Sequence, residues 1–220
     1  MRLTMKPLLV LQRLHRNVRG LALIEFALSL PIVVTLLLFG LETVNLGLAI
    51  LRVHQIAATS ADNAARVRDS INEADVNEVL LGGKLIGESM AFAARGRIIL
   101  SDVMPNGKTG TIAGQTILWQ RCTGALNSAD SQPHYGREGK GANDSSLQAM
   151  GATGRQIVAS SGAPMIFAEV TYRYEPLVSE TIFGTPVLRS EASFSVRERA
   201  SEALTSVPAV TPSVCTRYDL

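Results

Sequence analysis

The sequence has few of the residues that build catalytic and metal-binding sites. Its three histidines and two cysteines show no H-x-x-x-H or C-x-x-C spacing of the kind that binds zinc. Residues 106–110 end like a phosphate-binding loop and residues 87–91 begin like a nucleophile elbow, but each lacks a required glycine. We therefore expect no enzyme, no metal and no cofactor. A tethered enzyme stays open as an alternative, because active sites form in space rather than in sequence.

Acidic residues are missing from the first 20 positions, whose charged residues are Arg2, Lys6, Arg13, Arg16 and Arg19. Because the whole chain has a net charge of +2, residues 21–220 carry −3. The basic character belongs to the N-terminal tail, so the main body gives no support to nucleic-acid binding. A basic tail directly before an apolar run is instead typical of a membrane-topology signal.

An apolar run follows this tail, from Leu21 to Leu41, and its only charged residue is Glu25. Fourteen of its residues are Leu, Ile, Val or Phe, which together favour insertion into a bilayer by about 6 kcal/mol. A charge at the bilayer centre costs roughly 2.5–3.5 kcal/mol, and less near an end of the span, where Glu25 lies. The run is also long enough to cross the hydrocarbon core as a helix. We therefore predict that residues 21–41 form a transmembrane helix.

The charges that flank the span predict its orientation. Residues 1–20 form a cationic leader that stays in the cytoplasm, so the part of the chain after the span is exported. A cleaved secretory signal peptide is the competing interpretation. It is disfavoured because the apolar run is longer than a signal core and no A-x-A-like site follows it.

Residues 42–95 are predicted to form an amphipathic helical stem, because apolar residues recur there at steps of three and four. One continuous helix is expected over residues 21–69. The letters SINE at residues 70–73 fit a capping box that would start a second helix. The glycine pair at residues 82–83 is expected to interrupt that helix.

Residues 96–220 change to short runs typical of β-strands, separated by turn residues. One of these runs, residues 165–174, alternates as a half-buried strand does. Residues 127–146 are polar and rich in glycine, and we expect them to form an exposed loop. Helices first and strands afterwards predict an α+β fold with a mainly antiparallel exported domain. The expected strands are residues 97–103, 116–122, 165–174, 181–184 and 193–199.

The N-terminal letters RGLALIEFALSLP resemble the processing motif of the TadE-like pseudopilins, which are minor pilins of tight-adherence (Flp-type) pili. The matching positions are Arg19, Gly20, Leu21, Glu25, Phe26 and Pro31. The letters WQRCTG and FAEVTYRYEPLV are similar to the exported part of the same family. The resemblance implies a pilin-like subunit of the bacterial inner membrane, with its C-terminal domain in the periplasm. It also implies a role in pilus biogenesis, secretion and surface adhesion.

The resemblance implies that a prepilin peptidase cuts the chain between Gly20 and Leu21 on the cytoplasmic side. The cut would leave an ammonium group on Leu21 next to the hydrocarbon. Glu25 of a neighbouring subunit could neutralise this group and set the stagger between subunits, because a paired charge costs less than a lone one in low dielectric. The implied partners are the peptidase, other pilins and pseudopilins, the inner-membrane secretion platform and the lipid bilayer.

Cys122 and Cys215 are the only cysteines. In a periplasmic domain two cysteines predict one disulfide, and free or intermolecular thiols are the alternative. The function also has an alternative, in which the protein is an unprocessed single-pass anchor for a periplasmic binding or structural domain.

Overall fold

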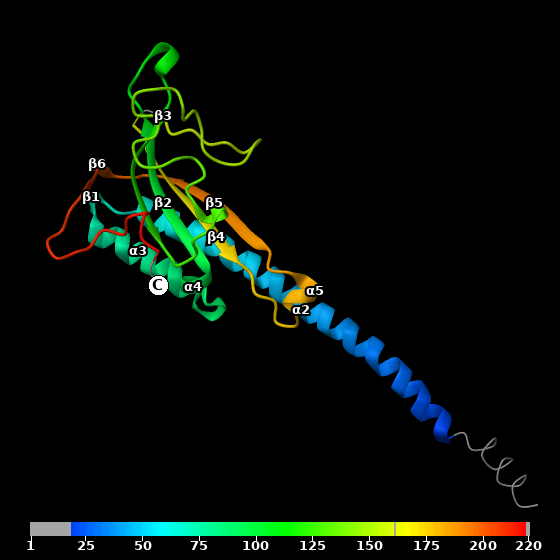
Figure 1. Ribbon diagram of the computed structural model, residues 1–220. Coiled ribbons are helices and arrows are strands. Elements are labelled where there is room, and N and C mark those ends of the chain that lie inside the picture. The colour runs from blue at the N-terminus through cyan, green and yellow to red at the C-terminus, as the bar shows by residue number, and fades with distance from the viewer. Residues whose placement is uncertain (1–18, 161, 219–220) are drawn as a thin grey trace, which may run out of the picture. The chain divides into compact units, whose positions relative to one another are not determined.

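The computed structural model describes residues 19–160 and 162–218 (Figure 1). The cationic leader lies outside the described residues except for Arg19 and Gly20. The chain divides into two compact units, Met1–Asn45 and Leu46–Leu220. Its architecture is α+β, in which a long apolar N-terminal helix is followed by a mainly antiparallel sheet. This confirms the predicted order of helices and strands.

Helix α2 spans Arg19–Ala65 and is 47 residues long. It ends four residues before the predicted end at Asp69, because Asp69 belongs to strand β1 (Asp69–Asn72). Asp69 has a φ of 59°, a left-handed conformation that cannot continue an α-helix. The predicted helical stem is therefore helical for most of its length but is interrupted by a strand.

Helix α3 spans Glu73–Ile86 and begins at a capping box formed by Asn72 and Asp75. The box lies two residues after the position predicted from SINE. The prediction that Gly82 and Gly83 interrupt this helix is wrong, since both lie within α3. A Cβ on Gly83 would lie 2.5 Å from Ile98 Cδ1 and 2.8 Å from Ser60 Oγ, so this glycine allows α3 to pack closely. The turns η1 (Glu88–Met90) and α4 (Phe92–Arg95) lead from α3 to the sheet.

The main sheet has four antiparallel strands in the order β3-β2-β4-β5 (Figure 1). Strands β1 and β6 form a separate parallel pair, in which Asp69 lies opposite Arg199. The bounds are Gly96–Pro105 for β2, Gln115–Thr123 for β3, Met165–Arg173 for β4, Val187–Ser195 for β5 and Arg199–Thr205 for β6. Short helical turns occur at η2 (Gly110–Ile112), η3 (Ala129–Ser131) and α5 (Glu180–Phe183).

Three of the five predicted strands are present, as β2, β3 and β4. Residues 181–184 were predicted as a strand, but α5 occupies most of them. Residues 193–199 cover the end of β5 and only the first residue of β6. Both errors concern short apolar runs, for which periodicity does not separate a strand from a helical turn.

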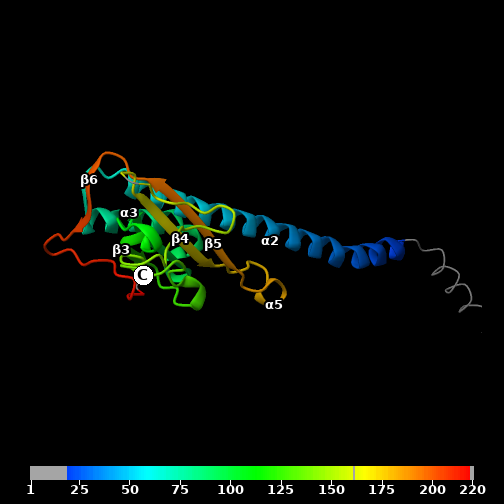
Figure 2. The same cartoon turned by 90° about the horizontal axis from the view of Figure 1, so that it is seen from above.

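Both faces of the sheet are buried, so the prediction of a half-buried strand at residues 165–174 is wrong. Eight of the nine residues of β4 are buried. One face packs against α3 and the part of α2 after Leu46, as Figure 2 shows. The other face packs under residues 124–160, where Met150 and Ala159 join the core beside Phe167. The segment predicted to be an exposed loop, residues 127–146, belongs to this covering layer and is partly buried, for example at Ser131.

Candidate functional site

The predicted processing and assembly residues lie on the first turns of α2. Leu21 and Phe26 are 65% and 62% exposed. Gly20 has no atom within 4 Å of where a Cβ would be, so packing does not explain why this position is a glycine. Glu25 follows Leu21 by four residues, and helical side chains lean toward the helix N-terminus. The carboxylate therefore lies on the same face of α2 as the Gly20–Leu21 peptide bond.

The serine and threonine hydroxyls within the apolar part of α2 are satisfied by the helix itself. Pro31 lies inside α2 without ending it, and Thr35 Oγ1 donates a hydrogen bond to the Pro31 carbonyl at 2.7 Å. Ser29 Oγ donates to the Phe26 carbonyl at 3.2 Å. Internal satisfaction of this kind suits a helix surrounded by lipid, where no water can supply the missing partner.

One helix among the described residues, Gly20–Ala65, is long and apolar enough to cross a membrane. Its most apolar stretch has a mean hydropathy of 2.4 over 18 residues, and none of that stretch is buried. A contiguous exposed apolar surface of this size is typical of contact with a membrane or another apolar partner.

The predicted disulfide is present and joins Cys122 of β3 to Cys215 in the C-terminal tail. Further bonds tie residues 206–218, called here the C-terminal tail, to β3 and α3. The Cys122 amide donates to the Ser213 carbonyl at 2.7 Å, and the Asn77 side chain donates to the Thr211 carbonyl at 3.0 Å. The disulfide indicates that this part of the chain folds in an oxidising compartment.

Arg97, at the start of β2, also holds the C-terminal tail. Its side chain is buried and donates to the carbonyls of Gly124, Cys215 and Arg217 at 2.7–2.9 Å. The guanidinium carbon lies 4.0 Å from the centroid of the Tyr218 ring, a cation–π contact. A buried arginine that bonds carbonyls of the tail has a structural role that its sequence position did not indicate.

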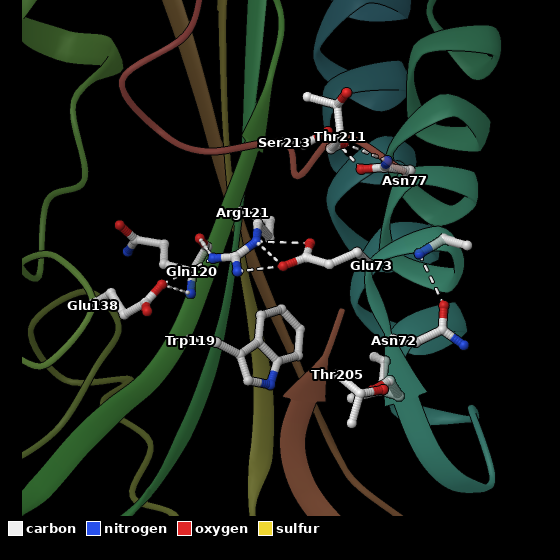
Figure 3. A network of polar contacts seen from close by, with 12 residues as sticks. Asn72, Glu73, Asn77, Trp119, Gln120, Arg121, Glu138, Thr205, Thr211 and Ser213 are labelled. Carbon is white, nitrogen blue, oxygen red and sulfur yellow. Dashed lines mark hydrogen bonds and ion pairs between the residues drawn. The ribbon is translucent and has the colours of Figure 1, made fainter. Parts of the chain in front are cut away.

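A buried ion pair joins α3 to β3, as Figure 3 shows. Arg121 Nε donates to both carboxylate oxygens of Glu73, at 2.9 and 3.0 Å. Its Nη1 reaches Glu138 at 2.9 Å. Burial alone would lower the pKa of Arg121, but the two carboxylates raise it above its ordinary value. The arrangement stabilises the positive charge and holds three separate segments together.

A buried carboxylate, Asp102, lies beside Arg199 and Glu202 of β6. Asp102 Oδ2 is 3.5 Å from Arg199 Nη1, and both side chains are fully buried. Arg199 also bonds Glu202 at 2.8 Å and the Ala64 carbonyl at 2.6 Å. Burial, followed by the charge of Glu202, raises the pKa of Asp102 to about 8, although Arg199 opposes this. The carboxyl group of Asp102 consequently holds its proton more tightly in the folded protein than an ordinary aspartate does.

A second buried carboxylate, Glu169 of β4, forms an ion pair with the neighbouring strand β5. Arg189 of β5 pairs with Glu169 at 2.6 Å and with Glu191 at 3.2 Å. Burial raises the pKa of Glu169 to about 7, against the lowering effects of the His134 amide and Arg189. Burial and the hydrogen bond to Glu191 raise the pKa of Tyr135 to about 12, so this tyrosine stays a donor.

The structure brings together a histidine and a serine that are 136 positions apart in the sequence. His54 Nδ1 lies 2.7 Å from Ser190 Oγ. No carboxylate among the described residues bonds to the other ring nitrogen, so the orienting group of a catalytic triad is missing there. Ser190 is also buried. The pair therefore joins β5 to α2, and neither residue had a local sequence signal that predicted this.

His54 also borders a cavity of about 550 Å³ that runs along β5. Within residues 19–160 and 162–218, no group of three or more His, Cys, Asp or Glu side chains is arranged to hold a metal ion. The residues that the structure offers for function are therefore an exposed apolar helix and a partly open cavity beside a strand. Comparisons with protein-family models, curated proteins and solved structures gave no match to this chain.

Proposed function

We propose that this protein is a single-pass minor pseudopilin of a bacterial inner membrane, assembling with a tight-adherence pilus or secretion apparatus. The observation that carries the proposal is the placement of Gly20, Glu25 and Pro31 at the start of one long, exposed apolar helix. The disulfide-bonded α+β unit after that helix suits a periplasmic domain. In this proposal the N-terminus is cytoplasmic, and the protein works by assembly rather than by catalysis.

The proposed mechanism begins with hydrolysis of the Gly20–Leu21 peptide bond by a prepilin peptidase. Hydrolysis releases residues 1–20 and leaves an ammonium group on Leu21. That charge lies at the edge of the hydrocarbon, where a lone ion is costly. When subunits pack side by side, Glu25 of one subunit pairs with the Leu21 ammonium of its neighbour. The pair then sets the stagger between helices, as single polar residues set register in helical bundles.

Intact-mass measurement of the protein from its native membrane tests the cut. We expect the mass of residues 21–220. Gly20→Val is expected to retain residues 1–20, whereas Gly40→Val serves as the matched control on the same helix. Both glycines have open space around an added Cβ, so the two substitutions disturb the described structure equally. Full-length mass in the wild-type protein would contradict the processing step.

The pairing step is tested separately with Glu25→Gln, which keeps the shape of the side chain and removes its charge. We expect this variant to be cut normally but to enter fibres about tenfold less than the wild-type protein, since one unpaired ammonium then remains in each contact. Quantification of the subunit in sheared fibres measures this. Incorporation at the wild-type level would contradict the role of Glu25 while leaving the processing step intact.

An anchored binding domain that keeps its leader is the second candidate function. The cavity along β5 favours this candidate, because a partly open cavity beside an edge strand is a place where a ligand can bind. A purely structural domain has no need of such a cavity. Retention of residues 1–20 in the intact mass, together with absence from fibres, would support this candidate over the first.

A further inference from the structure

Strand β5 forms one edge of the main sheet and, within residues 19–160 and 162–218, pairs with β4 alone. Two backbone hydrogen bonds at the ends of the β4–β5 pair show which residues of β5 direct their backbone groups inward, toward β4. The Tyr174 amide donates to the Pro186 carbonyl at 3.0 Å, and the Val196 amide donates to the Pro164 carbonyl at 2.8 Å. Bonded pairs alternate along an antiparallel ladder. The backbone groups directed inward therefore belong to Leu188, Ser190, Ala192 and Phe194. Those directed outward belong to Val187, Arg189, Glu191, Ser193 and Ser195.

The outward backbone groups of β5 have no partner in the part of the chain that the structure describes. No backbone hydrogen bond joins these five residues to another described segment. An unpaired strand edge of this length is a template for another strand, and proteins usually cover it. Here the edge stays available along nine residues.

A slot accompanies this edge. It is the 550 Å³ cavity, and its floor is formed by residues 189–194 of β5. One wall comes from His54 and Ala58 of α2, and the opposite wall comes from residues 151–157. The hydrogen bond between Ser190 and His54 places α2 on one face of the sheet. The packing of Met150 with Phe167, which lies opposite Ser193, places the layer that contains residues 151–157 on the other face. The slot thus borders the β5 edge from both faces of the sheet.

The composition of β5 argues against a second copy of this strand as the occupant. Its charged residues are already paired, since Arg189 contacts Glu169 and Glu191. A second β5 would therefore bring no unpaired charge to the slot. An extended segment of a different protein can bring one.

The charges in the slot favour an acidic segment. Arg189 and Glu191 compensate each other, whereas the side chain of Arg155 has no ion-pair or hydrogen-bond partner among the described residues and is exposed. A carboxylate on the incoming segment would form an ion pair with Arg155. Apolar contacts come from Ile157, Phe167 and Ala192.

We propose that the β5 edge is a docking site for an extended acidic segment of a partner protein, which adds to the main sheet as a fifth strand. Backbone hydrogen bonds to Arg189, Glu191 and Ser193 supply the general affinity, and Arg155 supplies the preference for acid. This site is independent of the processing and assembly proposed for α2, because it uses none of those residues.

The test uses the full-length protein in nanodiscs and a library of random seven-residue peptides displayed on phage. We expect selection of peptides that contain a carboxylate and β-branched residues. Synthetic versions are then measured by fluorescence anisotropy. Hydrogen exchange should slow at the amides of Arg189, Glu191 and Ser193 when a selected peptide binds.

Two variant pairs make the test decisive. Ser193→Pro removes one outward N–H and is expected to weaken binding about tenfold or more, while Ser193→Ala keeps that N–H and binds normally. Arg155→Glu is expected to reverse the preference, so that peptides with lysine in place of the carboxylate bind more tightly than the acidic ones. Arg155→Ala is expected to bind both kinds of peptide equally. A library that yields no binder, or binders unaffected by Ser193→Pro, would overturn the docking site. Unchanged preference in Arg155→Glu would overturn its acidic specificity.

Discussion

The two edges of the main sheet differ in whether their backbone groups have partners. On β3, the amides of Gln115, Ile117 and Cys122 donate to carbonyls of Leu147, Lys140 and Ser213. These acceptors lie in the layer over the second face and in the C-terminal tail. On β5, the outward backbone groups meet no described segment. One edge is therefore closed by distant parts of the chain, and the other is left open beside a slot.

The difference shows where stability and binding reside. The β3 edge carries the disulfide and the buried ion pair of Arg121, and Arg97 of the adjacent strand β2 contacts the same C-terminal tail. The β5 edge has no such covalent or backbone closure among the described residues, and its side chains are held by Glu169, His54 and Tyr135. Loss of interactions at the closed edge should destabilise the fold, whereas changes at the open edge should alter binding with little effect on stability.

The largest effect is expected when the disulfide at the closed edge is removed. Cys122→Ala combined with Cys215→Ala should lower the free energy of unfolding by about 4–5 kcal/mol, since the bond closes a loop with a sequence separation of 93. Trp119 is the only tryptophan and is buried, so its fluorescence reports denaturant unfolding. Identical unfolding midpoints for oxidised and reduced protein would contradict this assignment of stability to the β3 edge.

The ion pair beside the disulfide should contribute somewhat less. Glu73→Ala leaves Arg121 buried without its main partner and is expected to lower the free energy of unfolding by about 3 kcal/mol or more. Glu138 contacts the same guanidinium but is half exposed, so Glu138→Ala is the matched control, with a loss below about 1 kcal/mol. Equal losses in the two variants would show that burial does not decide the strength of this network.

A pH-dependent effect is expected from Asp102, which β6 and the sheet bury together. The ordinary pKa of 3.8 rises to about 8 in the folded state, mainly through burial. Between these values the folded protein holds a proton that the unfolded chain releases, so stability falls as the pH rises. From pH 5 to pH 7 the loss is about 2–3 kcal/mol, since one pKa unit corresponds to 1.36 kcal/mol.

Asp102→Asn should remove this part of the pH dependence, as denaturant unfolding at several pH values would show. Glu169→Gln provides the comparison on the other face of the sheet. Its pKa is raised to about 7, so it contributes in the same direction over a narrower range. A variant Asp102→Asn with the pH profile of the wild-type protein would refute protonation of Asp102.

The smallest effect on stability is expected at the open edge. Ser193→Pro removes an N–H that has no described partner, so the loss should stay below about 1 kcal/mol. At the next position, Ala192→Pro removes an N–H that bonds to β4 and should cost about 3 kcal/mol. Comparison of the two unfolding curves tests the inward and outward assignment directly. Similar losses at both positions would mean that the outer edge is covered.

The closed edge was partly predictable from the sequence, whereas only the last three residues of the open edge, 193–195, lay in a predicted strand. Cys122 and Cys215 identified the covalent bond, and β-branched and aromatic residues identified β2, β3 and β4. The residues of β5 are mostly small or charged, and such residues have low strand propensity when taken alone. Their strand is specified by pairing with β4, a contact that a local pattern does not reveal.

The candidate functional residues show the same difference between what the sequence reveals and what only the fold reveals. The apolar run, the glycine and the carboxylate of α2 are contiguous, so the sequence displays them directly. The slot combines His54, Arg155 and Ser193 from segments far apart in the chain. Arg97 and Asp102 were likewise missed, because one lies on a strand that looked ordinary and the other depends on Arg199 of β6. Burial in the folded state, rather than residue type, gives these side chains their properties.

The closed edge also determines the order in which parts of the fold can be completed during synthesis. Cys215 lies 93 positions after Cys122, and β1 finds its partner in β6, where Asp69 lies opposite Arg199. A ribosome makes the chain from the N-terminus, so β1 and β3 are made before the segments that complete them. The disulfide forms only after Cys215 has emerged. A chain truncated before Ser213 would lose the bond of the Cys122 amide to the C-terminal tail but keep the bonds of Gln115 and Ile117 to the covering layer.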